Sequence, residues 1–393
     1  MTIPKEESVD LRLTPDQEQF RHEVCGLLCE ESVQAEAARA FRLPPNEEPG
    51  LLDVYRRLGE RGWLAVNWPV EYGGLGKTLV EKAILTEEMI AHGVPELVHI
   101  LSIDIVGLAL SMFGTPDQKR RWLPRLASGE GAACVLLSEP DTGSDLSALA
   151  TRAEPEGDGW RLRGRKMYNM KAHVADFGLC AARTTESDAR YHGITVFIVP
   201  LRTPGVVIEP LWSMVDERFG DITLAGPLMT AADVLGDVDE GWHVLGQVLA
   251  LERTGIELEA KGRRLLDALV AQASHDGTLA DSPYGEHLVE LDALVRAGQL
   301  LSWRALGTVA DGAADTTLCA MAKWHVSETA RSVAALSSDV CGLAAALSAR
   351  DEDAPPGWVV ESGYREAPGF TLASGTSQMM LSLIASVALG LPT

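Results

Sequence analysis

The sequence predicts an α+β protein in which helices come first, strands follow, and helices return. Apolar residues recur at helical spacing in the first third of the chain. Short β-rich runs bounded by glycine and proline fill the middle, and helical spacing resumes at Gly241. We therefore expect an all-α domain over residues 1–131, a β-domain over 132–235 and a helical domain over 236–393.

The first region contains several helix signals. Pro15-Asp-Gln-Glu18 opens one helix, and Leu51–Gly62 and Leu79–Ala91 have the apolar spacing of two more. Thr115, followed by proline, is expected to cap a short helix that runs to Leu126.

The middle region is predicted to be a compact sandwich or barrel, because its strand-like runs are short and closely spaced. These runs are Trp160–Gly164, Gly193–Pro200, Val206–Glu209 and Asp221–Leu224. In the last region, periodicity predicts four helices, and the acidic stretch Arg350–Gly357 is expected to be a loop. The predicted helices are Trp242–Ala273, Tyr284–Ala310, Thr316–Leu347 and Ser377–Leu389.

Composition excludes some classes of protein. The net charge of −22 makes binding to nucleic-acid phosphates unfavourable. The N-terminal segment contains no apolar core of a secretory signal. The apolar stretch Ile100–Phe113 is interrupted by Asp104 and is too short to span a membrane. Six scattered cysteines are expected to be reduced thiols in a cytoplasmic protein, and the histidine spacing predicts no metal site.

Five short motifs, taken in their order along the chain, point to a known family. They are Trp68–Gly76, Leu137–Asp145, Gly164–Tyr168, Gly236–Trp242 and Gly375-Thr-Ser-Gln378. With these five motifs in register, the chain resembles the acyl-CoA dehydrogenase family over roughly residues 15–390. The resemblance implies a helical N-terminal domain, a β-domain, a C-terminal four-helix bundle, and FAD bound across the subunits of an oligomer.

The resemblance also implies a set of flavin contacts. In the loop Leu137–Asp145, Gly143 would let the backbone approach a ligand closely, and the hydroxyls of Ser138 and Ser144 could meet flavin or pyrophosphate. The alternative is a polar loop in which Glu139-Pro140 sets a turn. The full set of residues expected at the cofactor is Leu137, Ser138, Gly143, Ser144, Tyr168, Met170, Gly342, Thr376 and Gln378.

The chain departs from the family pattern at several places. Met170-Lys-Ala replaces a threonine-asparagine-glycine turn, and Gly342 is what remains of a double glycine. An arginine that reaches a neighbouring subunit's FAD corresponds to Asp281, whose carboxylate would repel pyrophosphate. Ser374 stands where the family usually has its catalytic glutamate.

Removing a proton α to a thioester requires a carboxylate, so an active dehydrogenase without a glutamate at position 374 needs its base elsewhere. Glu252 precedes Arg253, as the base does in the isovaleryl-CoA and long-chain members that this arrangement resembles. Helical spacing places Glu252 on a stripe with Leu245, Val248 and Ile256, where burial would raise its pKa. The alternative is a surface carboxylate, a role for which Glu257 and Glu259 are the better candidates.

The leading hypothesis is an FAD-dependent dehydrogenase that forms an α,β double bond in an acyl thioester of CoA or a carrier protein. Glu252 would be the base, while Arg253, Ser144 and the Ser374 backbone N–H would bind substrate. An electron-transfer flavoprotein is the expected acceptor. One alternative is a base-deficient or partner subunit of a heteromeric acyl-CoA dehydrogenase, and another is a flavin monooxygenase-like relative.

Overall fold

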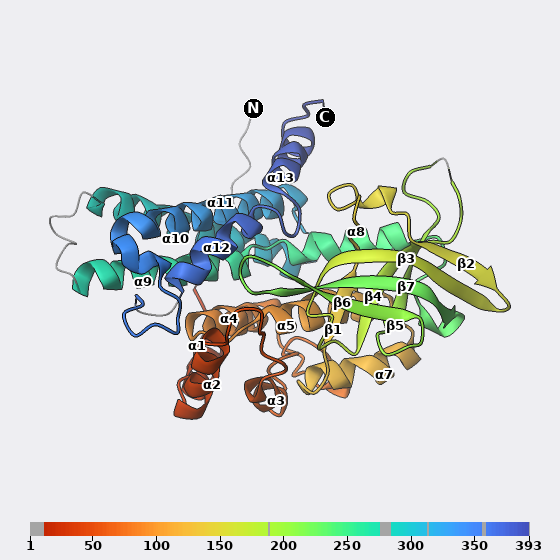
Figure 1. Cartoon of the computed structure of the whole chain (residues 1–393), viewed down its shortest axis with the longest axis horizontal. Helices are drawn as coiled ribbons and strands as arrows, with labels where there is room; N and C mark the ends of the chain where they lie inside the picture. The colour runs from red at the N-terminus through yellow and green to blue at the C-terminus, as the bar shows by residue number, and fades with distance from the viewer. Residues whose placement is uncertain (1–11, 188, 276–283, 313, 356–358, 393) are drawn as a thin grey trace.

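The computed structural model describes residues 12–187, 189–275, 284–312, 314–355 and 359–392. Figure 1 shows the strands gathered on one side of the molecule and the C-terminal helices on the other. The N-terminal helices lie along both, and α13 projects from the bundle with the C-terminus. Within the described ranges, no helix combines the length and the apolar character needed to cross a bilayer.

The N-terminal helices begin where the sequence offers caps. Thr14, Thr78 and Thr115 each form a capping box, in which the threonine side chain and the residue three positions later satisfy each other's backbone N–H groups. The predicted helix Leu51–Gly62 is shorter than expected, since it covers only Asp53–Gly59. The elements are α1 Pro15–Leu28, α2 Glu31–Phe41, α3 Asp53–Gly59, α4 Leu79–Ala91, α5 Leu97–His99, the π-helix η2 Ile100–Gly107, α6 Leu108–Phe113 and α7 Pro116–Ala127.

The middle of the chain forms one mixed sheet of eight strands, and its two halves share an apolar core that includes Leu162 of β3 and Phe197 of β5. Its hydrogen-bonded order is β6-β7-β3-β2-β4-β5-β8, with β1 parallel to β4. Two long strands explain this continuity, because β3 pairs with β2 and β7, and β7 pairs with β3 and β6. The strands are β1 Ala133–Leu136, β2 Arg152–Glu156, β3 Gly159–Met170, β4 Phe177–Arg183, β5 Ile194–Pro200, β6 Val206–Trp212, β7 Arg218–Thr230 and β8 Val234–Leu235.

The C-terminal helices differ from the prediction at one important place. The expected helix Trp242–Ala273 is broken, because α8 ends at Glu252 and α9 begins at Ile256. Gly255 lies between them with φ +85°, a left-handed conformation that interrupts a helix. The helices are α8 Gly241–Glu252, α9 Ile256–His275, α10 Gly285–Ala310, α11 Thr316–Cys341, the 3₁₀ turn η5 Gly342–Ala346, α12 Val360–Phe370, α13 Ser377–Leu383 and the π-helix η7 Ile384–Ala388.

Two apolar cores join these parts. In one, η2 and α8 pack against the sheet, through buried residues such as Leu101, Phe177 and Val248. In the other, α9, α10, α11 and α12 pack together around residues that include Leu266 and Val333. Helix α8 therefore links the sheet to the bundle, because it packs against the sheet and its C-terminal end leads directly into α9 (Figure 1).

Candidate active site

The loop of residues 137–145, which follows β1, is fixed by a buried ion pair. The fully buried Lys166, on β3, donates to the Glu139 carboxylate at 2.8 Å. The backbone N–H groups of Ala150 and Thr151 donate to the same carboxylate at 2.6 and 3.0 Å. Burial raises the pKa of Glu139, but Lys166 and these hydrogen bonds outweigh burial and leave that pKa below its ordinary value. Glu139 is therefore a structural anchor of the loop.

Strand β3 also fixes the backbone at the start of this loop. Lys166 Nζ donates to the Leu137 carbonyl at 3.1 Å, and the backbone N–H of Met167 donates to the Ser138 carbonyl at 2.9 Å. These bonds bring the loop beside the C-terminal end of β3. The structure thus brings two of the sequence motifs into contact.

The tip of the loop and the end of β3 both offer exposed groups. Gly143 and Ser144 are exposed, and a Cβ added at Gly143 would meet no atom within 4 Å. Tyr168 has φ +62°, is 55% exposed and lies edge-on to Phe219 with 6.2 Å between ring centroids. A left-handed backbone is unusual for tyrosine, and a register shift between β3 and β7 accompanies it. Met170 is half-buried and packs against the core.

The second candidate region is the segment Thr371–Ser377, which we call the C-terminal loop. Ser374 is exposed and has φ +54°, and Gly375 has φ +95°. Any larger residue at Gly375 would be strained by this φ, so the backbone conformation favours glycine there. The loop ends where Thr376 caps α13 by accepting a hydrogen bond from the Met379 N–H at 3.1 Å. Gln378, on the first turn of α13, is exposed.

Arg253 joins the C-terminal loop to the end of α8. Its Nε donates to the Ser374 carbonyl at 3.0 Å. Since Arg253 directly follows the last residue of α8, Glu252, this bond brings together the two chain segments that sequence reasoning selected for catalysis. The turn that breaks the predicted helix makes this approach to the loop possible.

Gly342 lies apart from this site within one chain. It follows α11, whose residue Lys323 contacts the C-terminal loop. From 323 to 342 is 19 residues, which corresponds to roughly 28 Å of helix. Asp281, the other departure expected near the cofactor, lies outside the described residues, as do Ser282 and Pro283.

Sequence reasoning missed the residues of α11 that support the C-terminal loop. Lys323 is 1% exposed and donates to the carbonyl of Phe370, at the end of α12, and to that of Gly375 in the loop. Glu328 accepts a hydrogen bond from the Ser377 hydroxyl at 2.6 Å. A signal was present, since Lys323 lies on the apolar stripe of Cys319, Val326 and Ala330. A lysine on a buried stripe requires polar partners.

One cluster has metal-ligand types but not the character of a metal site. Ligand atoms of Cys25, Glu88 and His92 lie within 4.8 Å of one another. Arg21 Nε already pairs with Glu88 at 3.2 Å, and the Cys25 thiol donates to Glu88 at 3.0 Å. Burial and the Glu88 carboxylate raise the pKa of Cys25 to about 12, which opposes the thiolate that a metal needs. The six cysteines, all within the described ranges, form no disulfide.

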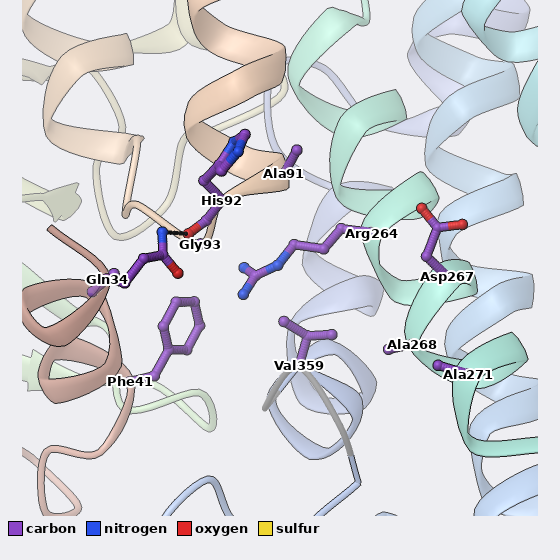
Figure 2. A pocket seen from close by; sticks show the side chains of 11 residues that line it. Gln34, Phe41, Ala91, His92, Gly93, Arg264, Asp267, Ala268, Ala271 and Val359 are labelled. Atoms are coloured by element: carbon purple, nitrogen blue, oxygen red, sulfur yellow. Dashed lines mark hydrogen bonds between the residues drawn. The ribbon is translucent and has the colours of Figure 1, made fainter. Parts of the chain in front are cut away.

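A cavity of about 460 Å³ lies between the N-terminal helices and the bundle, away from both loops. Figure 2 shows the Arg264 guanidinium pointing between Phe41, Gln34 and the end of α4. The guanidinium lies 5.0 Å from the Phe41 ring centre, and burial lowers the pKa of Arg264 to about 10. None of the residues that the sequence analysis selected lines this cavity.

The fold and these two loops define a flavoprotein-type scaffold, and comparisons with known proteins identify it. Profiles of the acyl-CoA dehydrogenase N-terminal, middle and C-terminal domains match residues 14–130, 134–225 and 239–389. The chain therefore belongs to the acyl-CoA dehydrogenase family, whose members are FAD flavoproteins that oxidise a CH–CH bond of acyl-CoA.

Individual relatives cover almost the whole chain. Acyl-CoA dehydrogenase FadE26 of Mycobacterium tuberculosis is 30% identical over 395 residues, which is 96% of this chain and 98% of that protein. The structure of the Tcur3481-Tcur3483 steroid ACAD matches with a TM-score of 0.89 and 27% identity, over 98% of this chain and 100% of that one. The ChsE4-ChsE5 complex from Mycobacterium tuberculosis matches with a TM-score of 0.83 and 27% identity, over 98% and 100%.

The residues of the first loop suit an FAD. The open space at Gly143, the exposed hydroxyl of Ser144 and the exposed ring of Tyr168 offer close backbone approach, hydrogen-bonding groups and an aromatic surface. The buried Lys166–Glu139 pair keeps this loop in place without using the exposed groups.

Proposed function

We propose that this chain dehydrogenates an acyl thioester, with Glu252 as the base and FAD bound at the loop of residues 137–145. The observation that supports this proposal most directly is the hydrogen bond from Arg253 to the Ser374 carbonyl. It joins the end of α8, where Glu252 lies, to the loop on which the family usually places its base. This contact supports the proposal that a carboxylate at the end of α8 replaces one on the C-terminal loop.

The roles follow from what each group can do. Glu252 takes the proton from the carbon α to the thioester carbonyl, and the backbone N–H of Ser374 donates to the carbonyl oxygen as negative charge develops there. Arg253 holds the Ser374 carbonyl, which lies in the peptide group that follows this N–H. When bound, FAD supplies the acceptor for the hydride from the β carbon. The remaining cofactor contacts in this proposal are Leu137, Ser138, Gly143, Ser144, Tyr168, Met170, Thr376 and Gln378.

The test is anaerobic reduction of the bound flavin by a panel of acyl thioesters. We expect the visible flavin band of the purified protein to bleach with at least one acyl-CoA, and Glu252→Gln to slow bleaching by about 10²–10⁴-fold. Glu257→Gln is the matched control, because Glu257 lies in the next helix and pairs with Lys261 at 3.0 Å. Equal bleaching by the Glu252 variant and the unmodified protein would exclude Glu252 as the base.

We also propose that the acyl group is bulky and ring-containing. The support is the likeness to the Tcur3481-Tcur3483 protein, which is described as a steroid ACAD. The panel should therefore compare a steroid side-chain CoA ester with straight-chain, branched-chain and carrier-protein thioesters. Faster reduction by a straight-chain ester than by the steroid ester would contradict this assignment. An electron-transfer flavoprotein is the proposed acceptor, and a cytoplasmic location the proposed setting.

A second function, as one subunit of a heteromeric dehydrogenase, has its own support. The two structural relatives above are named by two chains each, Tcur3481-Tcur3483 and ChsE4-ChsE5. In this chain, apolar residues of α13 and the segment after it are exposed: Met379, Leu381, Val387, Leu389 and Leu391. Gly342 lies far from the other proposed cofactor contacts of its own chain, as it would if it served a neighbouring subunit.

Co-expression separates the two functions. A protein that purifies without flavin alone, and acquires flavin only with a second family member, would be half of a shared site. A protein that binds flavin and bleaches alone would be self-sufficient.

A further inference from the structure

The C-terminal loop adopts a backbone conformation that needs external support. Ser374 and Gly375 have consecutive positive φ values of +54° and +95°. A serine rarely adopts the left-handed conformation, because its Cβ crowds the following carbonyl. Ser374 is exposed, so its side chain is not packed in a core that would impose this conformation.

Lys323 supplies support from beneath the loop. It lies on α11, is 1% exposed and directs its ammonium at the backbone carbonyls of Phe370, at 3.0 Å, and Gly375, at 2.7 Å. These carbonyls flank the loop on either side of Ser374. A buried ammonium is costly to desolvate, so its retention on an otherwise apolar helix stripe calls for a specific role.

Arg253 acts on the neighbouring carbonyl from another direction. Its Nε donates to the Ser374 carbonyl at 3.0 Å, while Lys323 holds the Gly375 carbonyl. Two consecutive peptide groups are thus oriented by cations that come from the end of α8 and from α11. The Ser374 N–H belongs to the preceding peptide group, which is joined to the first of these by φ and ψ of Ser374. Holding the two carbonyls therefore restrains the direction of this N–H through the left-handed conformation of Ser374.

We propose that Lys323 is a positioning residue for the dehydrogenation, and that it orients the C-terminal loop so that the Ser374 N–H meets the thioester oxygen. This inference rests on the proposed function. Lys323 does not touch the substrate. It acts through the Gly375 peptide.

A purely structural role would tie α11 to α12 without affecting substrate recognition. The two roles differ in which ligands they affect. Loss of loop orientation should weaken the binding of a ligand that has a carbonyl oxygen. It should leave the affinity for a ligand without one unchanged. A general loss of packing should affect both ligands equally.

The experiment compares two unreactive ligands, an S-alkyl-CoA thioether and the matching S-(2-oxoalkyl)-CoA ketone, by calorimetry. Lys323→Met should weaken binding of the ketone about tenfold and leave the thioether within about twofold. Lys323→Arg, which keeps a cation and several donors, should restore part of the difference. Ser327→Ala is the matched control, because the buried Ser327 hydroxyl bonds the Lys323 carbonyl within α11 and does not reach the loop.

Hydrogen exchange gives a readout that does not depend on substrate. In Lys323→Met the amides of residues 371–378 should exchange about tenfold faster, with no change in the loop of residues 137–145. The proposed role of Lys323 would be overturned if the exchange rates of residues 371–378 were unchanged. It would also be overturned if the affinities for both ligands fell equally. If Lys323→Met does not fold, Arg253→Lys should produce the same selective loss through the other cation. Failure of the unmodified protein to bind either ligand would refute the proposed function, while the exchange result would still decide on Lys323.

Discussion

The two loops of the candidate site are supported in similar ways but use their side chains differently. Each is held by a buried lysine that donates to a backbone carbonyl of the loop: Lys166 bonds Leu137, and Lys323 bonds Gly375. In the loop of residues 137–145, the lysine also pairs with a carboxylate, Glu139. In the C-terminal loop the serine at position 374 offers no carboxylate. A second cation, Arg253, donates instead to the Ser374 carbonyl, next to the one that Lys323 bonds.

This difference indicates that positioning and proton transfer are separable in this fold. The lysine, the arginine and the glycine that shape the C-terminal loop are all in place although the usual base is absent. A backbone N–H needs only the correct loop conformation, whereas a base needs a carboxylate at one point in space. In the proposed function, a carboxylate at the end of α8 reaches that point in place of one on the loop.

The strongest test of this separation moves the base between the two sites. Glu252→Gln should slow flavin reduction by about 10²–10⁴-fold. Adding Ser374→Glu to that variant should recover at least about tenfold, because the loop is already held in place by Lys323 and Arg253. Stopped-flow reduction by the best acyl-CoA measures both rates.

The control for this double variant is Ser374→Glu alone. Two carboxylates near one α-proton compete and repel, so the single variant should be slower than the unmodified protein. If the double variant binds the ketone ligand normally but reduces flavin no faster than Glu252→Gln alone, a carboxylate on the loop does not reach the α-proton.

Breaking the buried pair of the other loop should affect stability instead of proton transfer. Lys166→Met leaves Glu139 buried without its cation, which we expect to lower the free energy of unfolding by about 3–5 kcal/mol. This variant should also lose flavin in proportion to the fraction of the protein that unfolds. Arg163→Met is the matched control on the same strand, because the Arg163–Glu154 pair is half-exposed and should contribute less than about 1 kcal/mol. Urea unfolding followed by circular dichroism measures both.

The sequence predicted the order of helices and strands, the helix cap at Thr115 and the loop of residues 137–145, because these depend on local patterns. It missed the break at Gly255, since apolar spacing continues on both sides of the turn and a lone glycine does not fix a boundary. It also missed Lys323 and Glu328, which lie about 50 residues from the loop they support. Their partners are backbone carbonyls and a hydroxyl that only the folded bundle brings together.

Buried acidic groups away from the loops should make the free energy of unfolding depend on pH in the opposite sense to Glu139. The stability that Glu139 contributes is present above its unfolded pKa and is lost as pH falls through its lower folded pKa. In α9, burial raises the pKa of Glu259 to about 8, with Glu87 adding repulsion. The unfolded chain releases this proton near pH 4.5 but the folded chain retains it, so stability falls between about pH 4.5 and 8.

Glu259→Gln should remove much of that slope and stabilise the protein at pH 8 by on the order of a few kcal/mol. Glu257, whose pKa burial raises to about 7, contributes a slope of the same sign that should persist. Urea unfolding at pH 5, 6.5 and 8 measures the effect. Equal slopes for the variant and the unmodified protein would mean that Glu259 is ionised in the folded state.

The smallest expected effect is at Ser374 itself. If this position acts only through its N–H, Ser374→Ala should change the rate of flavin reduction by less than about twofold, since alanine keeps the N–H and accepts a similar φ. The bonds from Lys323 and Arg253 involve carbonyls and would remain. A loss of more than about tenfold would mean that the hydroxyl takes part, and the C-terminal loop would then resemble the loop of residues 137–145 in depending on a side chain.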